Sequence, residues 1–234
     1  MRILFVSLAA LALAGAAPNE ASLLSEADIV PAAILPPPPA ETSPAHRAEL
    51  AELAEIEALR TPADVAAAKA DDATKSASIF AEAIGAGFAL DRFPETARLM
   101  SQVRVAEKFA ADRAKAAFRR PRPWIANPSI KACSTDDEPL SSYPSGHTTM
   151  GYSMAAVLAR LVPSRAPAIM ARAARYGESR LVCEVHYRSD VTAGETLGLV
   201  VAERLMAKPA FQVQYARAAA ELAALDLAAA PPPR

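Results

Sequence analysis

Alanine makes up about a quarter of this sequence, whereas glycine occurs only 8 times. Alanine has the highest intrinsic helix propensity, and a chain poor in glycine has few positions that weaken a helix. Of the 20 prolines, six lie between Pro31 and Pro44 and three at 231–233, so the middle of the chain is free to form long helices. The composition therefore predicts an all-α fold.

The first 16 residues have the pattern of a secretory signal peptide. Arg2 precedes an apolar stretch from Ile3 to Ala14, and Ala14-Gly15-Ala16 fits an A-x-A cleavage site. The stretch is about 12 residues long, whereas a transmembrane helix needs about 20. A buried N-terminal helix is the alternative, but neither a helical period nor a cap accompanies the stretch. We therefore expect a periplasmic or secreted protein with no membrane segment after cleavage.

The charge of the chain is almost balanced. Because 25 basic residues face 26 acidic ones, the formal net charge is −1, and the pI is about 6.3. This balance argues against a protein that is held to nucleic acid by bulk charge, so we expect no nucleic-acid partner.

Three parts are expected after the signal peptide. Residues 17–45 include four consecutive prolines at 36–39 and should form an extended arm lying on the domain. Residues 46–224 should form a single helical domain, and residues 225–234 a C-terminal tail. The stretch 119–146 is rich in Pro, Ser and Asp, and a loop of that length usually carries function. Caps and apolar periodicity predict helices over 45–60, 62–83, 94–118, 147–161, 167–182 and 191–207.

Three groups of residues, far apart in the sequence, suit the binding of an oxyanion. Arginine can place two donors on phosphate oxygens, lysine adds a point charge, and a hydroxyl with backbone amides can donate from the start of a helix. A tetrahedral phosphate group would use all of these donors. The groups are Lys115 with Arg122, then Ser145, Gly146 and His147, then Arg180, His186 and Asp190.

Two of the three histidines of the chain belong to these groups. Phosphoryl transfer needs a nucleophile and a proton donor on opposite sides of phosphorus, and two imidazoles can supply both without a metal. Asp190 follows His186 by four residues, so on a helical turn its carboxylate can orient the ring and leave the other nitrogen free to attack. His147 would then protonate the leaving oxygen.

Together the groups form three spaced motifs: KxxxxxxRP from Lys115, PSGH from Pro144 and SRxxxxxHxxxD from Ser179. This set resembles the signature of the class A bacterial non-specific acid phosphatases, which belong with the type 2 phosphatidic-acid phosphatases and the vanadium-dependent haloperoxidases. The resemblance covers residues from about 35 to 199. Eleven fixed residues at about 5% usage each make a chance match negligible.

The resemblance implies a single-domain helical bundle and a two-step reaction. His186 would attack the phosphoryl group under the guidance of Asp190, and the phosphohistidine would then be hydrolysed. His147 would act first as general acid and then as general base. Ser179 would help to position its neighbours, and no metal or other cofactor is expected. The residues expected to hold the phosphate oxygens are Lys115, Arg122, Ser145, Gly146 and Arg180.

One residue departs from the family pattern. The family commonly has a glycine two residues before the nucleophilic histidine, and this chain has Glu184 there. A carboxylate facing the phosphate would weaken anion binding, so Glu184 is expected to point away from it.

Several other polar or aromatic residues are given plainer interpretations. The acidic run at 136–138 is expected to be a solvated loop rather than a metal site, because two catalytic histidines leave no ligand set for zinc. Two aromatic residues, Phe118 and Trp124, suit either the leaving-group pocket or the core. Three residues are expected at the exposed surface: His46, Arg119 and Arg120.

The chain has two cysteines, Cys133 and Cys183. In an exported protein they can form a disulfide, which would fasten the 119–146 loop to the segment that carries His186. Closing a loop of about 50 residues would stabilise the fold by about 4 kcal/mol in the chain-entropy model. Two free buried thiols are the alternative.

The sequence thus predicts an exported, metal-independent acid phosphatase that acts on phosphate monoesters. A phosphotransferase side activity stays open, because an alcohol can replace water in the second step. A haloperoxidase is the alternative among enzymes, since vanadate occupies a phosphate-like cage. A helical protein that binds phosphate without turnover is the alternative outside enzymes, and the pairing of His186 with Asp190 argues against it. The natural substrate and the formation of a homo-oligomer stay open.

Overall fold

The computed structural model describes residues 21–85 and 87–223. The expected signal peptide at 1–16 and the expected tail at 225–234 lie outside these residues. Within them the regular secondary structure is entirely helical, which confirms the predicted all-α class. No helix in the described part of the chain combines the length and the apolar character needed to cross a membrane.

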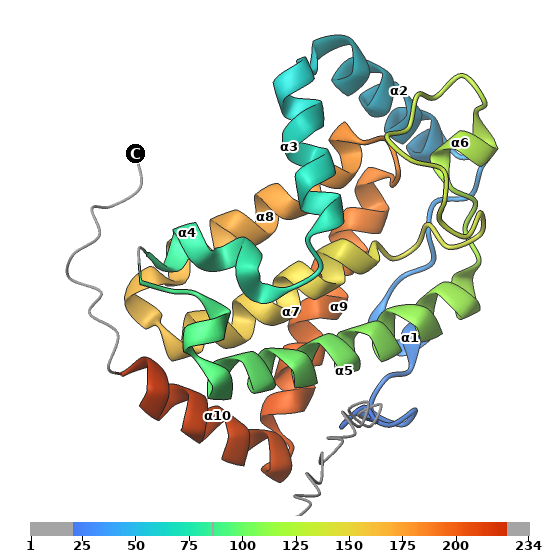
Figure 1. Ribbon diagram of the computed structural model, residues 1–234. Coiled ribbons are helices and arrows are strands. Elements are labelled where there is room, and N and C mark those ends of the chain that lie inside the picture. Colours follow the sequence, from blue (N-terminus) through green and yellow to red (C-terminus); the bar gives the residue numbers. More distant parts are fainter. Residues whose placement is uncertain (1–20, 86, 224–234) are drawn as a thin grey trace, which may run out of the picture.

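Four long helices form the centre of the fold (Figure 1). Helix α7 packs against each of the other three, and its inner face is buried with theirs in one apolar core. Met150 and Met154 of α7 meet a core that includes Val103 and Leu197, all of them almost fully buried. The four helices are α5 (Pro94–Phe118), α7 (Gly146–Leu161), α8 (Ala166–Val182) and α9 (Arg188–Met206).

Two glycines let α7 and α9 approach closely. A Cβ atom on Gly194 would lie 2.7 Å from the backbone oxygen of Ser145, and one on Gly198 would lie 2.7 Å from that of Thr149. Any larger side chain would force the helices apart. This contact brings the start of α7 against the first turns of α9, so residues 145–147 and Asp190 come from neighbouring backbones.

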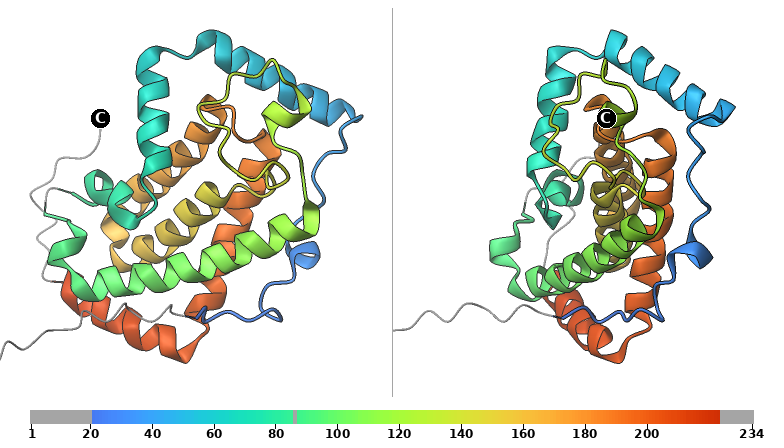
Figure 2. Two further views of the ribbon diagram at one scale, coloured as in Figure 1. Left: turned by 45° about the vertical axis from the view of Figure 1, so that its right-hand side comes forward. Right: turned by 90° about the vertical axis from the view of Figure 1, so that its right-hand side faces the viewer.

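The remaining helices cover the ends and sides of this centre. In Figure 1, α2 (Pro44–Leu59) and α3 (Pro62–Ala73) form the upper part, and α10 (Pro209–Leu222) lies below α5. Figure 2 shows the N-terminal segment following one side of the bundle. Short turns complete the described chain: α1 (Pro31–Ile34), α4 (Ala81–Ile84), α6 (Pro123–Ala126) and the 3₁₀ turns Ala77–Phe80, Leu90–Arg92 and Pro163–Arg165.

Residues 21–45 are anchored to the bundle by apolar side chains and by the packing of α1 against α5 and α9. Leu24, Ile29 and Leu35 are buried in the main core. The hydroxyl of Tyr143 donates a hydrogen bond of 2.6 Å to the backbone oxygen of Pro36, at the start of the four prolines. This contact ties the N-terminal segment to the loop that precedes α7.

The predicted helices are confirmed, with different bounds for two of them, and one further long helix was not predicted. The helix expected over 62–83 ends at Ala73, because Thr74 takes an extended conformation and Ser76 caps a separate 3₁₀ turn. Hydroxyl side chains compete with helical hydrogen bonds in this stretch. Helix α9 begins three residues earlier than expected, at Arg188. Helix α10, which starts with proline at its first position, was not predicted.

Candidate active site

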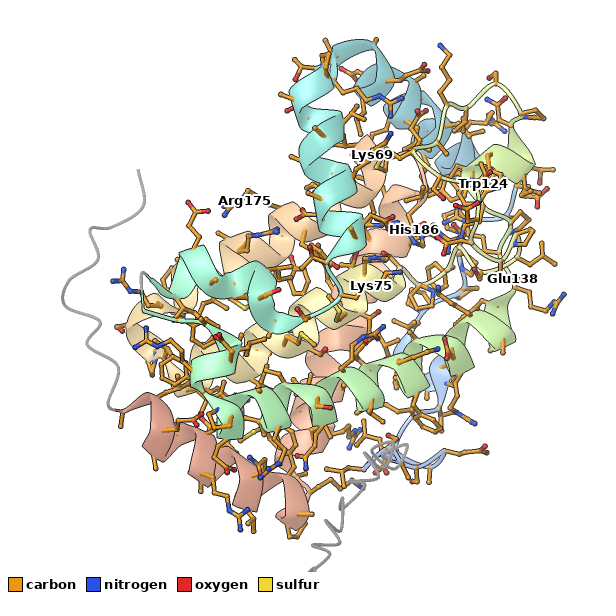
Figure 3. The ribbon with its side chains drawn as sticks, viewed as in Figure 1. Lys69, Lys75, Trp124, Glu138, Arg175 and His186 are labelled. Carbon is orange, nitrogen blue, oxygen red and sulfur yellow. A yellow bond between two sulfur atoms is a disulfide. The ribbon has the colours of Figure 1, made fainter. Side chains whose placement is uncertain are left out.

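Five of the eight expected site residues line one cavity of about 220 Å³, whereas Ser145, Arg180 and Asp190 do not line it and contact residues beside it. Figure 3 shows His186 between the lower end of α3 and the loop that carries Trp124. Both imidazoles of interest, those of His147 and His186, line this same cavity. Lys115, Arg122 and Gly146 line it with them. Six further charged side chains line the cavity: Lys75, Arg104, Glu107, Lys108, Asp112 and Asp137.

His186 lies in the short turn between α8 and α9 and is 1% exposed. Its Nδ1 is 3.3 Å from Oδ2 of Asp190, and its Nε2 is 3.0 Å from a guanidinium nitrogen of Arg122. A guanidinium can only donate, so Nε2 must accept and Nδ1 must carry the proton that is donated to Asp190. The geometry therefore leaves the lone pair of Nε2 directed at the cationic side of the cavity.

The sequence predicted that His186 and Asp190 lie on one helical turn, and this prediction is wrong. His186 precedes α9, and Asp190 belongs to the first turn of that helix. Oδ2 of Asp190 accepts from the backbone amide of Tyr187 at 2.8 Å, in the manner of a helix cap, and from the hydroxyl of Ser142 at 2.5 Å. The cap thus fixes the carboxylate that orients the imidazole.

The surroundings of His186 favour its neutral form. Burial lowers the pKa of His186 well below its usual value, and the charges of Arg122, Arg180 and Lys115 lower it further. A neutral imidazole retains the lone pair that a nucleophile needs.

Three cationic side chains can face a bound anion. The side chains of Arg122 and Arg180 are almost fully buried, and each has a buried Nε atom without a hydrogen-bond partner. Buried donors normally have partners, so these guanidinium groups fit a site for an oxygen-rich ligand. Burial and the charge of Arg122 lower the pKa of Lys115 to about 8. A Cβ atom on Gly146 would lie 3.5 Å from Nζ of Lys115, so this backbone faces the lysine closely.

Ser145 is the N-cap of α7. Its hydroxyl accepts hydrogen bonds from the backbone amide and the hydroxyl of Thr148, which leaves its own proton available for donation. Its backbone amide donates to the backbone oxygen of Asp190 at 2.9 Å. The N-terminal end of α7, with Gly146 at its first position, thus faces the cavity with its positive pole.

His147 lies one residue further along α7. Its Nε2 is 3.1 Å from the backbone oxygen of Asp72 and 3.3 Å from the carboxylate Oδ1 of the same residue. Burial lowers the pKa of His147, and Arg180 lowers it further. A bound phosphate dianion would offset these cations and favour the protonated imidazole.

The structure adds a buried network that sequence reasoning missed. Arg120 donates to Oδ1 of Asp190 and to Oε2 of Glu49, each at 2.6 Å. Its second terminal nitrogen is also 3.3 Å from Nδ1 of His46. The exposed positions predicted for Arg120 and His46 are therefore wrong, since they are 5% and 4% exposed. The charge of Arg120 holds Asp190, and of the three residues predicted to be exposed only Arg119 is so.

The sequence contains no direct signal for this network, because Glu49 comes from a helix that is distant in the sequence. Glu49 lies in α2 and also accepts from the backbone amide and hydroxyl of Ser189. In the sequence it is one of several glutamates on an amphipathic helix. The available hint was the presence of two consecutive arginines within the KxxxxxxRP motif.

Glu184 does not line the cavity, and its carboxylate is paired with a cation. Its backbone has a φ of 53°, in the left-handed region that favours glycine, and its side chain is 1% exposed. Its carboxylate lies 2.7 Å from Arg60. Arg60 also donates to the backbone oxygens of Val182 and Lys131. The ion pair therefore accommodates an acidic residue two positions before His186.

The structure joins Cys133 to Cys183 by a disulfide, with a separation of 50 residues. The backbone amide of Cys133 also donates to the oxygen of Cys183 at 2.9 Å. Both contacts attach the long loop to the turn that carries His186.

The aromatic and acidic residues near the first motif have separate roles. The guanidinium carbon of Arg122 lies 5.5 Å from the centre of the Trp124 ring. Phe118 packs edge-on against Tyr143. Among the described residues, no group of three His, Cys, Asp or Glu side chains is placed to hold a metal ion. Asp137, from the acidic run, instead pairs with Arg122 at 3.2 Å.

Comparison with known proteins identifies the family of this chain. The family model described as the PAP2 superfamily matches residues 100–212. The non-specific acid phosphatase of Salmonella typhimurium is 34% identical over 196 residues, covering 80% of this chain and 78% of that protein. The chain belongs to the bacterial non-specific acid phosphatases. This finding confirms the resemblance to class A enzymes that the three motifs carried.

Other members and one solved structure agree with this membership. The non-specific acid phosphatase of Providencia stuartii is 34% identical, covering 82% of this chain and 81% of that protein. The acid phosphatase of Zymomonas mobilis is 35% identical over 70% of this chain and 64% of its own length. The crystal structure of a transmembrane PAP2 type phosphatidylglycerolphosphate phosphatase from Bacillus subtilis matches with a TM-score of 0.54 and 18% identity. It covers 70% of this chain and 85% of the other, and it supports the fold.

Proposed function

We propose that this protein is an exported, metal-independent acid phosphatase that hydrolyses phosphate monoesters through a phosphohistidine at His186. The proposal is carried by one observation: the imidazoles of His147 and His186 line the same cavity as Lys115 and Arg122. A nucleophile, a proton donor and fixed positive charge thus surround one volume. Membership of the acid phosphatase family supports the same activity.

In the first step, Nε2 of His186 attacks phosphorus and forms a P–N bond. The ester P–O bond breaks, and the leaving oxygen takes a proton from Nδ1 of His147, because Nε2 of that ring donates to Asp72. Asp190 accepts the Nδ1 proton of His186 in a hydrogen bond and stabilises the positive charge that develops on the ring. In the second step, His147 removes a proton from water, which attacks phosphorus and breaks the P–N bond to release phosphate.

We expect five groups to hold the equatorial oxygens of the substrate, and three of them, Lys115, Arg122 and Gly146, line the cavity. Arg122 now donates to Nε2 of His186, so substrate entry has to transfer that donor to a phosphate oxygen. Arg180 and Lys115 supply further charge, and Ser145 with the backbone amide of Gly146 supplies donors at the helix start. These groups act where charge is spread in the transition state.

The reaction needs a protonated His147 beside a neutral His186, which favours mild acid. Cations and burial lower the pKa values of both rings, and the substrate dianion opposes this effect on His147. A steady rise of kcat/KM from pH 5 to pH 9 would refute this part of the proposal.

Export to the periplasm or the medium is proposed from the signal-peptide pattern at 1–16 and from the disulfide. A phosphotransferase side activity is proposed because the phosphohistidine can react with an alcohol in place of water. It is measured as the ratio of phosphorylated glycerol to inorganic phosphate.

The decisive experiment is hydrolysis of p-nitrophenyl phosphate by the purified protein in the presence of chelator. We expect turnover to persist, and to be abolished in His186→Ala without a change in the far-UV circular dichroism spectrum. Saturable binding of inorganic phosphate without any turnover would instead establish a binding protein. Bromide oxidation after addition of vanadate and peroxide, in the absence of phosphatase activity, would establish a haloperoxidase.

A further inference from the structure

We propose that Asp72 is a positioning residue of the reaction, which couples the proton donor His147 to the phosphate-binding Arg180. Its carboxylate keeps the imidazole competent to protonate poor leaving groups. This inference rests on the proposed function, since it concerns the protonation step of that reaction. The carboxylate belongs to α3, which none of the three motifs includes.

The last turn of α3 contacts His147 in two ways. The backbone oxygen of Asp72 lies 3.1 Å from Nε2 of His147, and the carboxylate Oδ1 lies 3.3 Å from the same nitrogen. Both groups are acceptors, so Nε2 carries a proton that it donates to them. The backbone oxygen also lies at the C-terminal end of α3, where the helix dipole is negative and favours a cation.

The other charged groups near this imidazole explain why an acid is needed there. Burial, Arg180 and Lys75 lower the pKa of His147, whereas the hydrogen bond to the backbone oxygen of Asp72 and the charge of Asp137 raise it. Asp72 is in direct contact, whereas Asp137 pairs with Arg122. The carboxylate of Asp72 is therefore placed to counter the two cations when the ring takes up a proton.

The same oxygen of Asp72 also holds the phosphate-binding arginine. Oδ1 lies 2.6 Å from a terminal nitrogen of Arg180, whose side chain is 1% exposed. Arg180 retains a buried Nε without a partner. One face of the guanidinium is thus fixed by the carboxylate, and another donor stays available for a phosphate oxygen.

Neighbouring contacts fix the end of α3 in this position. Asp71 accepts from Arg172 and, at 2.6 Å, from the hydroxyl of Ser179, both on α8. The hydroxyl of Tyr176, also on α8, donates to the backbone oxygen of Thr74 at 2.8 Å. Asp72 therefore reaches the site from a rigid element, and Asp71 provides a control of equal charge on the adjacent position.

A coupling of this kind predicts a dependence on the leaving group. An alkoxide cannot depart without a proton, whereas p-nitrophenolate is stable and departs with little assistance. General acid catalysis is worth about 10²-fold or more in rate, and this contribution falls as the leaving group improves. Removal of the charge from Asp72 should therefore impair alkyl phosphates more than p-nitrophenyl phosphate.

The test compares kcat/KM for glycerol 2-phosphate and for p-nitrophenyl phosphate in the full-length wild type, Asp72→Asn and Asp71→Asn. We expect Asp72→Asn to lower the alkyl-to-aryl ratio by about tenfold or more, and Asp71→Asn to leave it unchanged. The ratio is measured within each variant, so it does not depend on the fraction of protein that folds.

An unchanged ratio in Asp72→Asn would overturn the inference, whether both rates fall or neither does. A parallel rise of both rates would also overturn it, because the carboxylate would then only compete with phosphate for Arg180. Turnover of neither substrate by the wild type would instead contradict the proposed function. The two failures are thus distinguishable.

Discussion

Replacement of Arg60 by methionine is expected to destabilise the protein strongly, because it leaves the carboxylate of Glu184 buried without a counter-ion. The two side chains are 12% and 1% exposed, and their charged atoms lie 2.7 Å apart. Removal of one partner of a buried ion pair costs about 3–5 kcal/mol. For a chain of this length, 1 kcal/mol corresponds to about 2–4 °C in the midpoint of thermal unfolding. Arg60→Met should therefore lower that midpoint by about 6–20 °C.

The same replacement should cost much less when position 184 is glycine. The Glu184→Gly variant has no buried carboxylate that needs a counter-ion. In that background Arg60→Met removes only packing and the hydrogen bonds to Val182 and Lys131. Such hydrogen bonds contribute about 1 kcal/mol each. Glycine also relieves the left-handed backbone at φ 53°, worth about 1 kcal/mol. We expect a coupling energy of about 1–3 kcal/mol between the two sites.

The assay is a double-mutant cycle of unfolding free energies from urea denaturation, measured at pH 5 and pH 8. Burial raises the pKa of Glu184, although Arg60 opposes this effect. Without Arg60 the folded pKa rises further above the unfolded value. The destabilisation should therefore be smaller at pH 5, where the acid can take up a proton, and larger at pH 8. Equal costs of Arg60→Met in both backgrounds would refute the reasoning.

Three further predictions concern the site. Replacement of Cys133 and Cys183 by alanine opens a loop of 50 residues and should cost about 4 kcal/mol in urea denaturation under oxidising conditions, whereas a cost below about 1 kcal/mol would contradict this. Burial and Arg122 lower the pKa of Lys115 to about 8, so its charge is lost as pH rises through 8. The KM for p-nitrophenyl phosphate should then rise above pH 8 in the wild type and stay constant in Lys115→Arg, and equal rises would exclude Lys115 as the cause. Because the folded pKa of His186 lies well below 6.5, the unfolded chain binds a proton there that the folded protein does not. The stability from this group therefore rises with pH up to about 6.5, and the slope of unfolding free energy between pH 5 and 7 should be smaller in His186→Asn; an unchanged slope would show that the group titrates normally.

The fold class and the cavity residues were predictable because they depend on local signals. Alanine content, prolines and caps identify helices within short windows, as the capping box of Thr61 and Asp64 at the start of α3 illustrates. The motif residues carry chemistry in their own side chains. Lys115, Arg122, Gly146, His147 and His186 accordingly meet in one cavity.

The supporting residues were not predictable because their partners are distant in the sequence. Arg120 is buried only because Glu49 and Asp190 accept from it, across separations of 71 and 70 residues. Asp72 is one of two adjacent acids near a helix end, a pattern that is usually solvated. The role proposed for it depends on α3 ending where His147 and Arg180 lie, and this end was predicted ten residues too late.

The most direct test of the central claim is to locate the phosphoryl group on the enzyme during turnover. Enzyme mixed with p-nitrophenyl phosphate is quenched rapidly in alkali, where phosphohistidine survives, then digested and analysed by mass spectrometry. We predict one phosphoryl group on the peptide that carries His186, and its loss on acid treatment. A phosphoryl group on Ser145, or turnover of the substrate without any phosphorylated peptide, would contradict the account.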